Sequence, residues 1–220
     1  MKAVIFDMFE TLVTLHSVPR YFGRNVAADL GADIEEFYPL WHETEEARSK
    51  GKMTFEESLL WIGERTHYTH PERIPSAVEK RYAFKTESLQ KVEYRIVSLL
   101  RELKERGYKV ALISNCFLEE AEAIRASVLA TCFDVMMLSC EQGVQKPEHE
   151  IFERCLAELA VAPEECLYVG DGGSLELETA REFGMETLQA GWFLKNEQEN
   201  WKKEGFETAE DPAEVLRKVV

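Results

Sequence analysis

Four residues have types and positions in this sequence that suggest a reactive or ligand-binding site: Asp7, Ser114, Lys146 and Asp171. Asp7 and Ser114 each end an apolar run, and Asp171 follows the glycine that ends another. A carboxylate placed like that of Asp7 can be a nucleophile or a metal ligand, although aspartate also caps ordinary turns. A phosphoryl group needs donors and cations for its oxygens, and a metal to offset its repulsion from an attacking carboxylate. Ser114 and Lys146 suit the first need, and the two aspartates suit the second.

Five short apolar runs predict the strands that must bring these residues together. The first run, residues 3–6, does not alternate apolar and polar side chains, which is typical of a strand covered on both faces in a parallel sheet. Segments with helical periodicity separate the runs, which indicates right-handed crossovers and helix layers on the sheet. Ligands collect outside the carboxyl ends of such strands. We expect strands near residues 3–6, 108–113, 133–138, 166–170 and 185–188.

The segment from Val18 to about Lys85 has helical periodicity and no strand pattern. Breaks at Gly31, at Gly51 and between His70 and Pro75 divide it into about four helices. The crossover after the first strand must therefore contain an inserted helical unit. Further helices are expected over residues 92–105 and, as a docking helix within the charged segment 197–220, over residues 212–219.

Composition and charge narrow the class of protein. At 220 residues, 45% of them hydrophobic and 30% charged, the chain can bury a substantial core. The formal charge of −15 argues against nucleic acid or an anionic membrane as a partner. Because no run of about 18 apolar residues is present and Asp7 interrupts the apolar N-terminus, we expect no membrane span, no signal peptide and a cytoplasmic location. Five cysteines without CxxC spacing favour reduced core thiols.

The motifs around these residues resemble, in order, those of the haloacid dehalogenase (HAD) superfamily. They read Phe6-Asp7-Met8-Phe9-Glu10-Thr11-Leu12, Ile113-Ser114-Asn115, Lys146-Pro147 and Val169-Gly170-Asp171-Gly172-Gly173-Ser174. Each is weak alone, but four in order at strand ends, across roughly residues 1–191, are a strong signal. The resemblance implies an α/β fold with a Rossmann-like, doubly wound parallel sheet core and an inserted α-helical cap domain of the C1 type, subfamily I. The implied catalytic core is residues 1–13 and 88–220, with the helical cap insertion at 14–87.

Carried onto this sequence, the resemblance implies catalysis by Asp7, Ser114 and Lys146. Asp7 would attack phosphorus and become an aspartyl phosphate, while Ser114 and Lys146 would hold the phosphoryl oxygens. The implied cofactor is Mg²⁺, bound by Asp7, Asp171 and the backbone carbonyl of Phe9, with waters and substrate completing the octahedron. The expected partner is a small phosphorylated substrate, and the expected assembly is a monomer or a homodimer.

Two further positions have two interpretations each. Asn115 follows Ser114 where relatives often contact substrate, but it also fits a plain turn. Glu176 falls where relatives often place a second acid near the metal, but it also fits a solvated acid in the first turn of a helix.

Four basic residues of the insertion could reach a substrate, although a charged helix face is usually solvated. They are Arg20, Arg24, Arg48 and Lys52.

Phe9 departs from the family pattern, because phosphatases of the family usually carry a second aspartate two residues after the nucleophile. That acid protonates the leaving group and then activates water, and such help is worth typically about 100- to 10,000-fold. Phenylalanine has no titratable group, so turnover of ordinary phosphomonoesters should be slow. Glu10 stands where relatives usually have glycine, and the sequence does not decide its role.

An aromatic residue at position 9 also resembles the 2-haloacid dehalogenase branch, in which an aspartate displaces halide from carbon without magnesium. Against this alternative, the loop Gly170–Ser174 resembles the metal-binding version of the motif. We therefore predict a magnesium-dependent phosphatase or phosphotransferase. A metal-independent dehalogenase-like hydrolase is the alternative, and a weakly active member that binds a phosphorylated ligand or a protein partner is the third interpretation.

Overall fold

A six-stranded parallel sheet forms the core of the computed structural model, which describes residues 1–67, 70–194 and 202–219. The strand order is β3-β2-β1-β4-β5-β6, and every neighbouring pair is parallel. The five predicted strands are confirmed to within two residues at their ends, and β6 is an addition. The strands are β1 Ala3–Phe6, β2 Lys109–Ser114, β3 Val135–Leu138, β4 Cys166–Gly170, β5 Glu186–Ala190 and β6 Thr208–Ala209.

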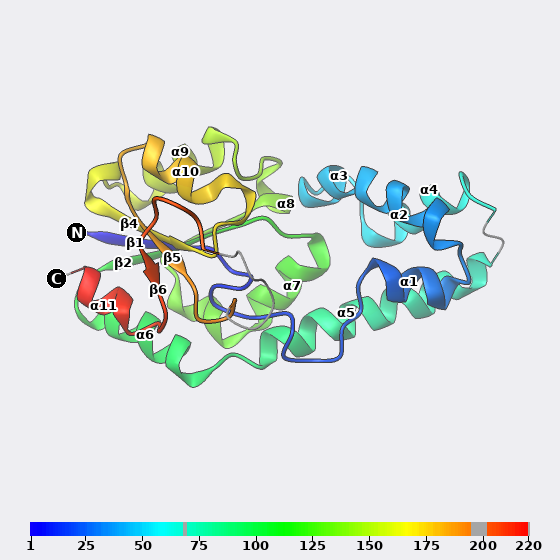
Figure 1. Ribbon diagram of the computed structural model, residues 1–220, viewed down its shortest axis with the longest axis horizontal. Coiled ribbons are helices and arrows are strands. Elements are labelled where there is room, and N and C mark those ends of the chain that lie inside the picture. The colour runs from blue at the N-terminus through cyan, green and yellow to red at the C-terminus, as the bar shows by residue number, and fades with distance from the viewer. Residues whose placement is uncertain (68–69, 195–201, 220) are drawn as a thin grey trace.

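Helices cover both faces of the sheet, so the predicted doubly wound architecture is confirmed (Figure 1). Side chains alternate between the faces along each strand. Val4 and Phe6 pack with α6, α7 and α11, whereas Ala3 and Ile5 pack with α9 and α10. All five cysteines are buried free thiols, as predicted. The helices of the core are α6 Tyr94–Glu105, α7 Leu118–Ala126, α8 Ser139–Gln142, α9 His149–Leu159, α10 Glu176–Glu182 and α11 Glu214–Lys218.

Strand β1 lies in the middle of the sheet and is completely buried. Phe6 is in register with Leu112 of β2 on one side and with Val169 of β4 on the other. The backbone N–H of Asp7 donates to the carbonyl of Val169 (2.9 Å), so the ladder continues one residue past the strand. Asp7 is thereby fixed at the carboxyl edge of the sheet, between two strands that also end there.

The inserted segment folds as a helical cap beside the core (Figure 1). About four helices were expected here, but the described part of the insertion contains five α-helices and a 3-10 turn at Pro71–Arg73. The additional break is at Thr44, whose hydroxyl donates to the carbonyl of Trp41 (2.8 Å) and so replaces a backbone donor. The cap helices are α1 Gly23–Leu30, α2 Ile34–Glu43, α3 Glu45–Ser49, α4 Phe55–Gly63 and α5 Ile74–Gln90.

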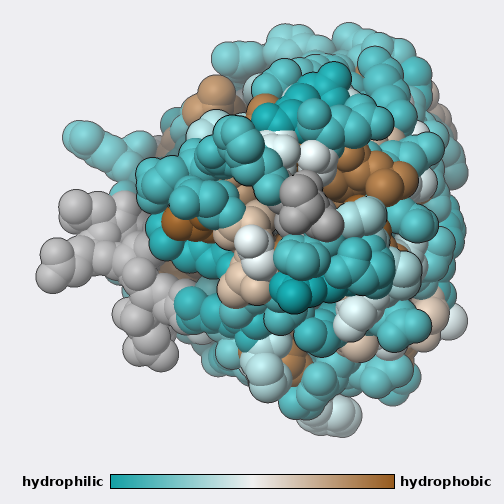
Figure 2. All heavy atoms as spheres, turned by 90° about the vertical axis from the view of Figure 1, so that its right-hand side faces the viewer, coloured by the Kyte–Doolittle hydropathy of each residue, from teal (hydrophilic) through white to brown (hydrophobic). Residues whose placement is uncertain are grey.

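The cap has a hydrophobic core of its own, separate from the two clusters on the sheet. Phe37, Trp41, Phe55 and Leu59 are among its buried members. The face of the cap that is turned away from the sheet is mainly hydrophilic (Figure 2). Within the described residues, no helix is long and apolar enough to cross a membrane. The amphipathic pattern of the insertion therefore packs the cap internally, as expected for helices that bury one face.

Two buried ion pairs join the cap helix α5 to the core helix α7. Arg81 Nε donates to Glu119 Oε1 (3.0 Å), and Lys85 Nζ lies 2.5 Å from Glu120 Oε1. Each of the four side chains is at most 5% exposed, so each charge depends on its partner. Helix α5 continues past residue 87 to Gln90, so the predicted boundary falls inside a continuous helix. The division into residues 1–13 with 88–220 and 14–87 stays a prediction.

A second set of contacts joins the cap to the core near α3. The hydroxyls of Ser49 and Ser139 are hydrogen bonded (3.1 Å), and Lys50 Nζ lies 2.7 Å from Glu148 Oε1. Gly51 has φ +66°, and a Cβ atom there would lie 1.9 Å from a core carbonyl oxygen, so only glycine fits. The cap therefore touches the core both through α5 and through the end of α3.

We predict that Glu120→Gln lowers the free energy of unfolding by about 3 kcal/mol or more, because it leaves Lys85 buried without its counter-charge. Glutamine keeps the side-chain acceptor for the N–H of Phe117, so the capping interaction of α7 is retained. Urea denaturation measures the change. The exposed control Glu122→Gln, on the same helix, should stay within about 0.5 kcal/mol of wild type. Equal stability of the two variants would show that the buried pair does not anchor the cap.

Candidate active site

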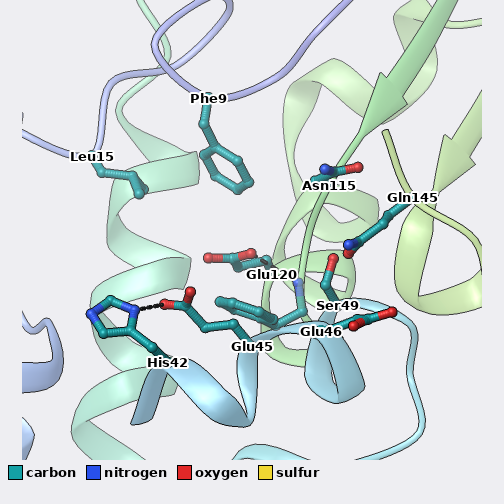
Figure 3. A pocket seen from close by; sticks show the side chains of 10 residues that line it. Phe9, Leu15, His42, Glu45, Glu46, Ser49, Asn115, Glu120 and Gln145 are labelled. Carbon is teal, nitrogen blue, oxygen red and sulfur yellow. Dashed lines mark hydrogen bonds and ion pairs between the residues drawn. The ribbon is translucent and has the colours of Figure 1, made fainter. Parts of the chain in front are cut away.

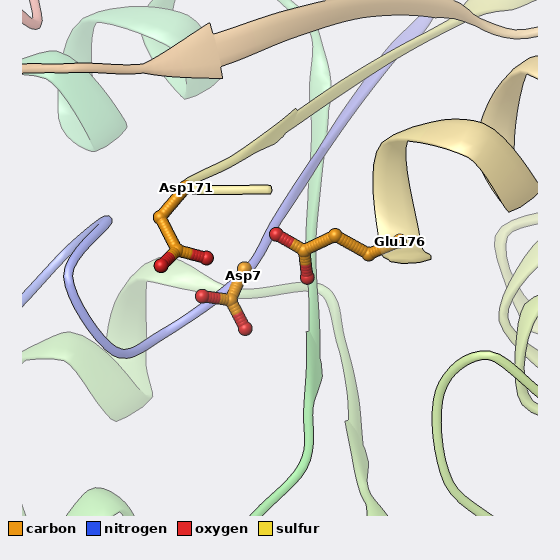
Figure 4. A group of neighbouring side chains, drawn as sticks. All are labelled: Asp7, Asp171 and Glu176. Carbon is orange, nitrogen blue, oxygen red and sulfur yellow. The ribbon is translucent and has the colours of Figure 1, made fainter. Parts of the chain in front are cut away.

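The carboxylates of Asp7, Asp171 and Glu176 converge at the carboxyl edge of the sheet (Figure 4). Asp7 follows β1, Asp171 follows β4, and Glu176 is the first residue of α10. Each offers an oxygen atom, and these atoms lie within 4.8 Å of one another. Glu176 is 1% exposed, so it is not the solvated acid that one interpretation of the sequence expected. Three chain segments thus bring three carboxyl groups to one point.

Lys146 supplies the positive charge that meets these carboxylates. Its ammonium donates to Asp7 Oδ1 (2.5 Å), to Glu176 Oε2 and to the hydroxyl of Tyr168 (3.4 Å). Burial alone would lower the pKa of Lys146, but the charges of Asp7 and Glu176 outweigh it and raise the pKa. The lysine is therefore a permanent cation inside the site. Its side chain holds the end of β1 and the start of α10 together.

The acids still outnumber the cation in this group. Burial and the charge of Asp7 raise the pKa of Asp171 to about 6 and that of Glu176 to about 8. A divalent cation would offset the excess negative charge, and carboxylate oxygens are the ligands that Mg²⁺ prefers. Glu176 already accepts from Lys146, Tyr168 and the N–H of Gly172. The group of Asp7, Asp171 and Glu176 therefore fits a magnesium ion.

Ser114 and Asn115 lie at the end of β2, next to β1. The hydroxyl of Ser114 is completely buried and has no hydrogen-bond partner among the described residues. Such orphaned groups are rare in proteins, and this one is available to an oxygen of a ligand. Asn115 instead binds the loop that contains Lys146, here called the lysine loop. Its Oδ1 accepts from the N–H of Lys146 (2.7 Å), and its Nδ2 donates to the carbonyl of Lys146 (2.9 Å) and to Ser174 Oγ (3.3 Å).

Two contacts in the site have no counterpart in the sequence analysis. Thr11 Oγ1 donates to Asp7 Oδ2 (3.3 Å), and Tyr168 donates its hydroxyl to Glu176 Oε2 (3.1 Å). The threonine belongs to the first motif and could have been singled out for that reason. Tyr168 reads as a core residue of β4, and only the position of Glu176 in space reveals its role.

Phe9 extends into a cavity of about 560 Å³ between the core and the cap, here called the cap–core cavity (Figure 3). Glu10 has φ +55°, and its Oε1 accepts from the N–H of Leu15 (3.0 Å), so it serves the turn into the cap and is not a member of the carboxylate group. The residues that line the cap–core cavity are Phe9, Leu15, His42, Glu45, Glu46, Ser49, Asn115, Phe117, Glu120 and Gln145.

The four basic residues considered for the insertion are not placed alike. Arg20, Arg24 and Lys52 are exposed. Arg48 is 1% exposed, and its guanidinium lies 4.4 Å from the ring centroids of both Trp41 and Phe117. Burial lowers the pKa of Arg48 to about 10. None of the four lines the cap–core cavity.

A parallel α/β core with buried acids and a lysine at its carboxyl edge places a candidate active site where open α/β sheets bind their ligands. The chain belongs to the haloacid dehalogenase-like hydrolase family, whose model matches residues 1–184. A glyceraldehyde 3-phosphate phosphatase of Methanopyrus kandleri is 29% identical over 198 residues, which are 86% of this chain and 83% of the relative.

Solved structures of the family share the fold. A dehalogenase is 22% identical, with a TM-score of 0.66 over 99% of this chain and 96% of the other. A HAD family enzyme of Bacteroides thetaiotaomicron, in complex with magnesium and inorganic phosphate, is 20% identical, with a TM-score of 0.63 over 86% of this chain and 94% of the other. The family predicted from four motifs is thus confirmed, and so is the fold.

We predict that Asp171→Asn weakens Mg²⁺ binding at least about tenfold, equivalent to about 1.4 kcal/mol, because the site loses a ligand charge. Isothermal titration calorimetry with MgCl₂ measures the affinity. The control is Glu178→Gln, because Glu178 lies nearby on α10 but pairs with Lys203 (2.6 Å). Equal affinity in Asp171→Asn and wild type would remove Asp171 from the metal site.

The raised pKa of Asp171 predicts the pH dependence of metal binding. A carboxyl group with a pKa of about 6 takes up a proton as the pH falls through 6, and magnesium must displace that proton. Affinity for Mg²⁺ should therefore be lost on acidification, by about tenfold per pH unit well below pH 6. Titrations between pH 5 and 8 test this, and a flat profile would contradict it.

Proposed function

We propose that this protein is a magnesium-dependent phosphatase of small phosphorylated metabolites that works through an aspartyl phosphate on Asp7. The observation that carries the proposal is the buried pair of Asp7 and Lys146, with Asp171 and Glu176 beside it. The orphaned hydroxyl of Ser114 adds a donor for a phosphoryl oxygen. Nucleophile, cation, donor and metal ligands are the set that phosphoryl transfer to a carboxylate requires.

The proposed reaction has two steps. An oxygen of Asp7 forms a bond to phosphorus, and the bond from phosphorus to the leaving-group oxygen breaks; that oxygen leaves with the electron pair and takes a proton from solvent water. Water then attacks the phosphorus of the aspartyl phosphate, which releases inorganic phosphate and restores Asp7. Lys146 and Ser114 stabilise the negative charge on the phosphoryl oxygens. A bound magnesium ion would screen the repulsion between that charge and the carboxylates.

The relatives support a phosphate ester as the substrate. The Methanopyrus kandleri relative is a glyceraldehyde 3-phosphate phosphatase, and the Bacteroides thetaiotaomicron structure holds magnesium and inorganic phosphate. The proposal takes from them the class of reaction and the cofactor. The substrate itself is set by the cap–core cavity, which this chain builds from its own side chains.

Phe9 limits the second step. Its ring has no ionisable proton, and Lys85 Nζ lies 5.5 Å from the ring centroid. Burial lowers the pKa of Lys85 to about 8, and the ammonium is held by Glu120. Water that attacks the aspartyl phosphate therefore meets no general base at position 9. The phosphoenzyme should persist, and turnover should be low.

We predict that Phe9→Asp raises turnover of p-nitrophenyl phosphate by about tenfold or more, because it supplies the missing acid and base. Phe9→Asn is the matched control: it removes the ring without adding a titratable group and should give no such gain. Acid-quench trapping of ³²P-labelled protein should find less phosphoenzyme in Phe9→Asp than in wild type. Equal or lower turnover in a folded Phe9→Asp variant would mean that position 9 does not limit hydrolysis.

The dehalogenase-like hydrolase stays as a second candidate because Phe9 favours it. A halide leaving group needs no proton, so an acid at position 9 would be superfluous. This reaction would release halide from 2-chloropropionate without added metal and would be insensitive to Asp171→Asn. Halide release under those conditions, with no turnover of phosphate esters, would replace the phosphatase proposal.

A further inference from the structure

The cap–core cavity lies beside the proposed phosphate site and shares Phe9 and Asn115 with its loops. In the proposed reaction the leaving group must therefore extend into it. Among the described residues, the side chains that line the cavity include three glutamates and no lysine or arginine. The rings of Phe9 and Phe117 and the side chain of Leu15 form its apolar part. The cavity is thus acidic and aromatic, next to a site built for an anion.

The three glutamates differ in how far their charge is offset. Glu120 pairs with the buried Lys85, and Glu46 pairs with Lys50 (2.8 Å). Glu45 points into the cavity, and its Oε1 lies 3.1 Å from the imidazole of His42 (Figure 3). That imidazole offsets the charge only when it is protonated. Among the described residues, Glu45 is therefore the one lining glutamate that pairs with a histidine and not with a lysine.

Two basic side chains near the cavity, those of Lys50 and Arg48, are already engaged. Lys50 is shared between Glu46 and Glu148, at 2.8 and 2.7 Å. Arg48 is stacked between two rings and is 1% exposed, and Phe117 is one of those rings. A second anionic group on the substrate would thus face Glu45 in a cavity whose lining, among the described residues, includes no lysine or arginine. Placing a second anion beside a carboxylate is unfavourable, because the like charges repel each other.

We propose that the cap–core cavity selects phosphomonoesters whose leaving group carries an ammonium group, with Glu45 as the residue that determines this specificity. The inference rests on the proposed phosphatase function. A carboxylate together with aromatic faces is the chemistry that recognises an organic ammonium ion. The same walls disfavour a leaving group with a second phosphate or a carboxylate. The substrate is thus anionic at the end held by Lys146 and cationic at the end held by Glu45.

Three esters of equal length separate charge from size: 2-aminoethyl phosphate, 2-hydroxyethyl phosphate and phosphoglycolate. Their leaving groups carry a positive charge, no charge and a negative charge. In wild type with magnesium, kcat/KM should fall in that order, by about tenfold or more from first to last. Equal values, or a preference for phosphoglycolate, would overturn the proposal.

Glu45→Gln should narrow the ratio between the first and last esters several-fold, because the carboxylate charge is lost while the hydrogen-bonding shape is kept. The control is Glu43→Gln, which removes the same charge from an exposed position of α2 that does not line the cavity. The control should keep the wild-type ratio. A ratio that changes equally in both variants would assign the effect to overall charge and not to the cavity.

Binding to the Asp7→Asn variant separates failure of this inference from failure of the proposed function. Calorimetry with the same three esters and magnesium measures affinity without turnover. If none of the three is bound or hydrolysed, the phosphatase proposal fails, and the inference falls with it. If all three are bound and hydrolysed without a charge order, the phosphatase proposal stands and the inference alone is wrong.

Discussion

The buried ammonium of Lys146 is the interaction on which the rest of the site depends. It lies among the carboxylates of Asp7, Glu176 and Asp171, which would otherwise repel one another at the edge of the sheet. Its backbone is fixed as firmly as its side chain, because Asn115 binds both its N–H and its carbonyl group. The loops after β1, β2 and β4 are thus joined through one residue. The organisation of the site for an anion follows from this charge balance.

A second set of ion pairs joins the cap to the core, and Phe9 lies between the cap and the carboxylate group. Buried pairs between α5 and α7 fix one side of the cap, and Lys50 with Glu148 joins the other side to the helix that follows the lysine loop. Phe9 faces the cavity that these contacts enclose. In the proposed reaction, a ring at this position would give up acid–base assistance and would provide an apolar wall for the leaving group. Reaction rate and substrate preference are therefore linked through one side chain.

The sequence predicted the strands well because burial on both faces of a parallel sheet leaves a local mark, an unbroken apolar run. Strand β6, Thr208–Ala209, has no such run and was missed. The pair of Arg81 and Glu119 was missed for a different reason. Its members are 38 residues apart and read as parts of solvated helix faces, and only tertiary packing buries them. The clamp by Asn115 likewise depends on two loops meeting in space, so the residue was found but its partners were not.

The central place of β1 has a consequence for how the chain is made. Strand β1, which Asp7 follows, is synthesised before the other strands of the sheet, yet its neighbours pair through Lys109 and Cys166, more than 100 and 160 residues later. At roughly 5 to 20 residues per second, a ribosome leaves this apolar strand without either partner for on the order of ten seconds. The helical cap emerges in that interval and has a hydrophobic core of its own. An insertion after the first strand thus lets part of the chain fold before the remaining strands of the sheet have been synthesised.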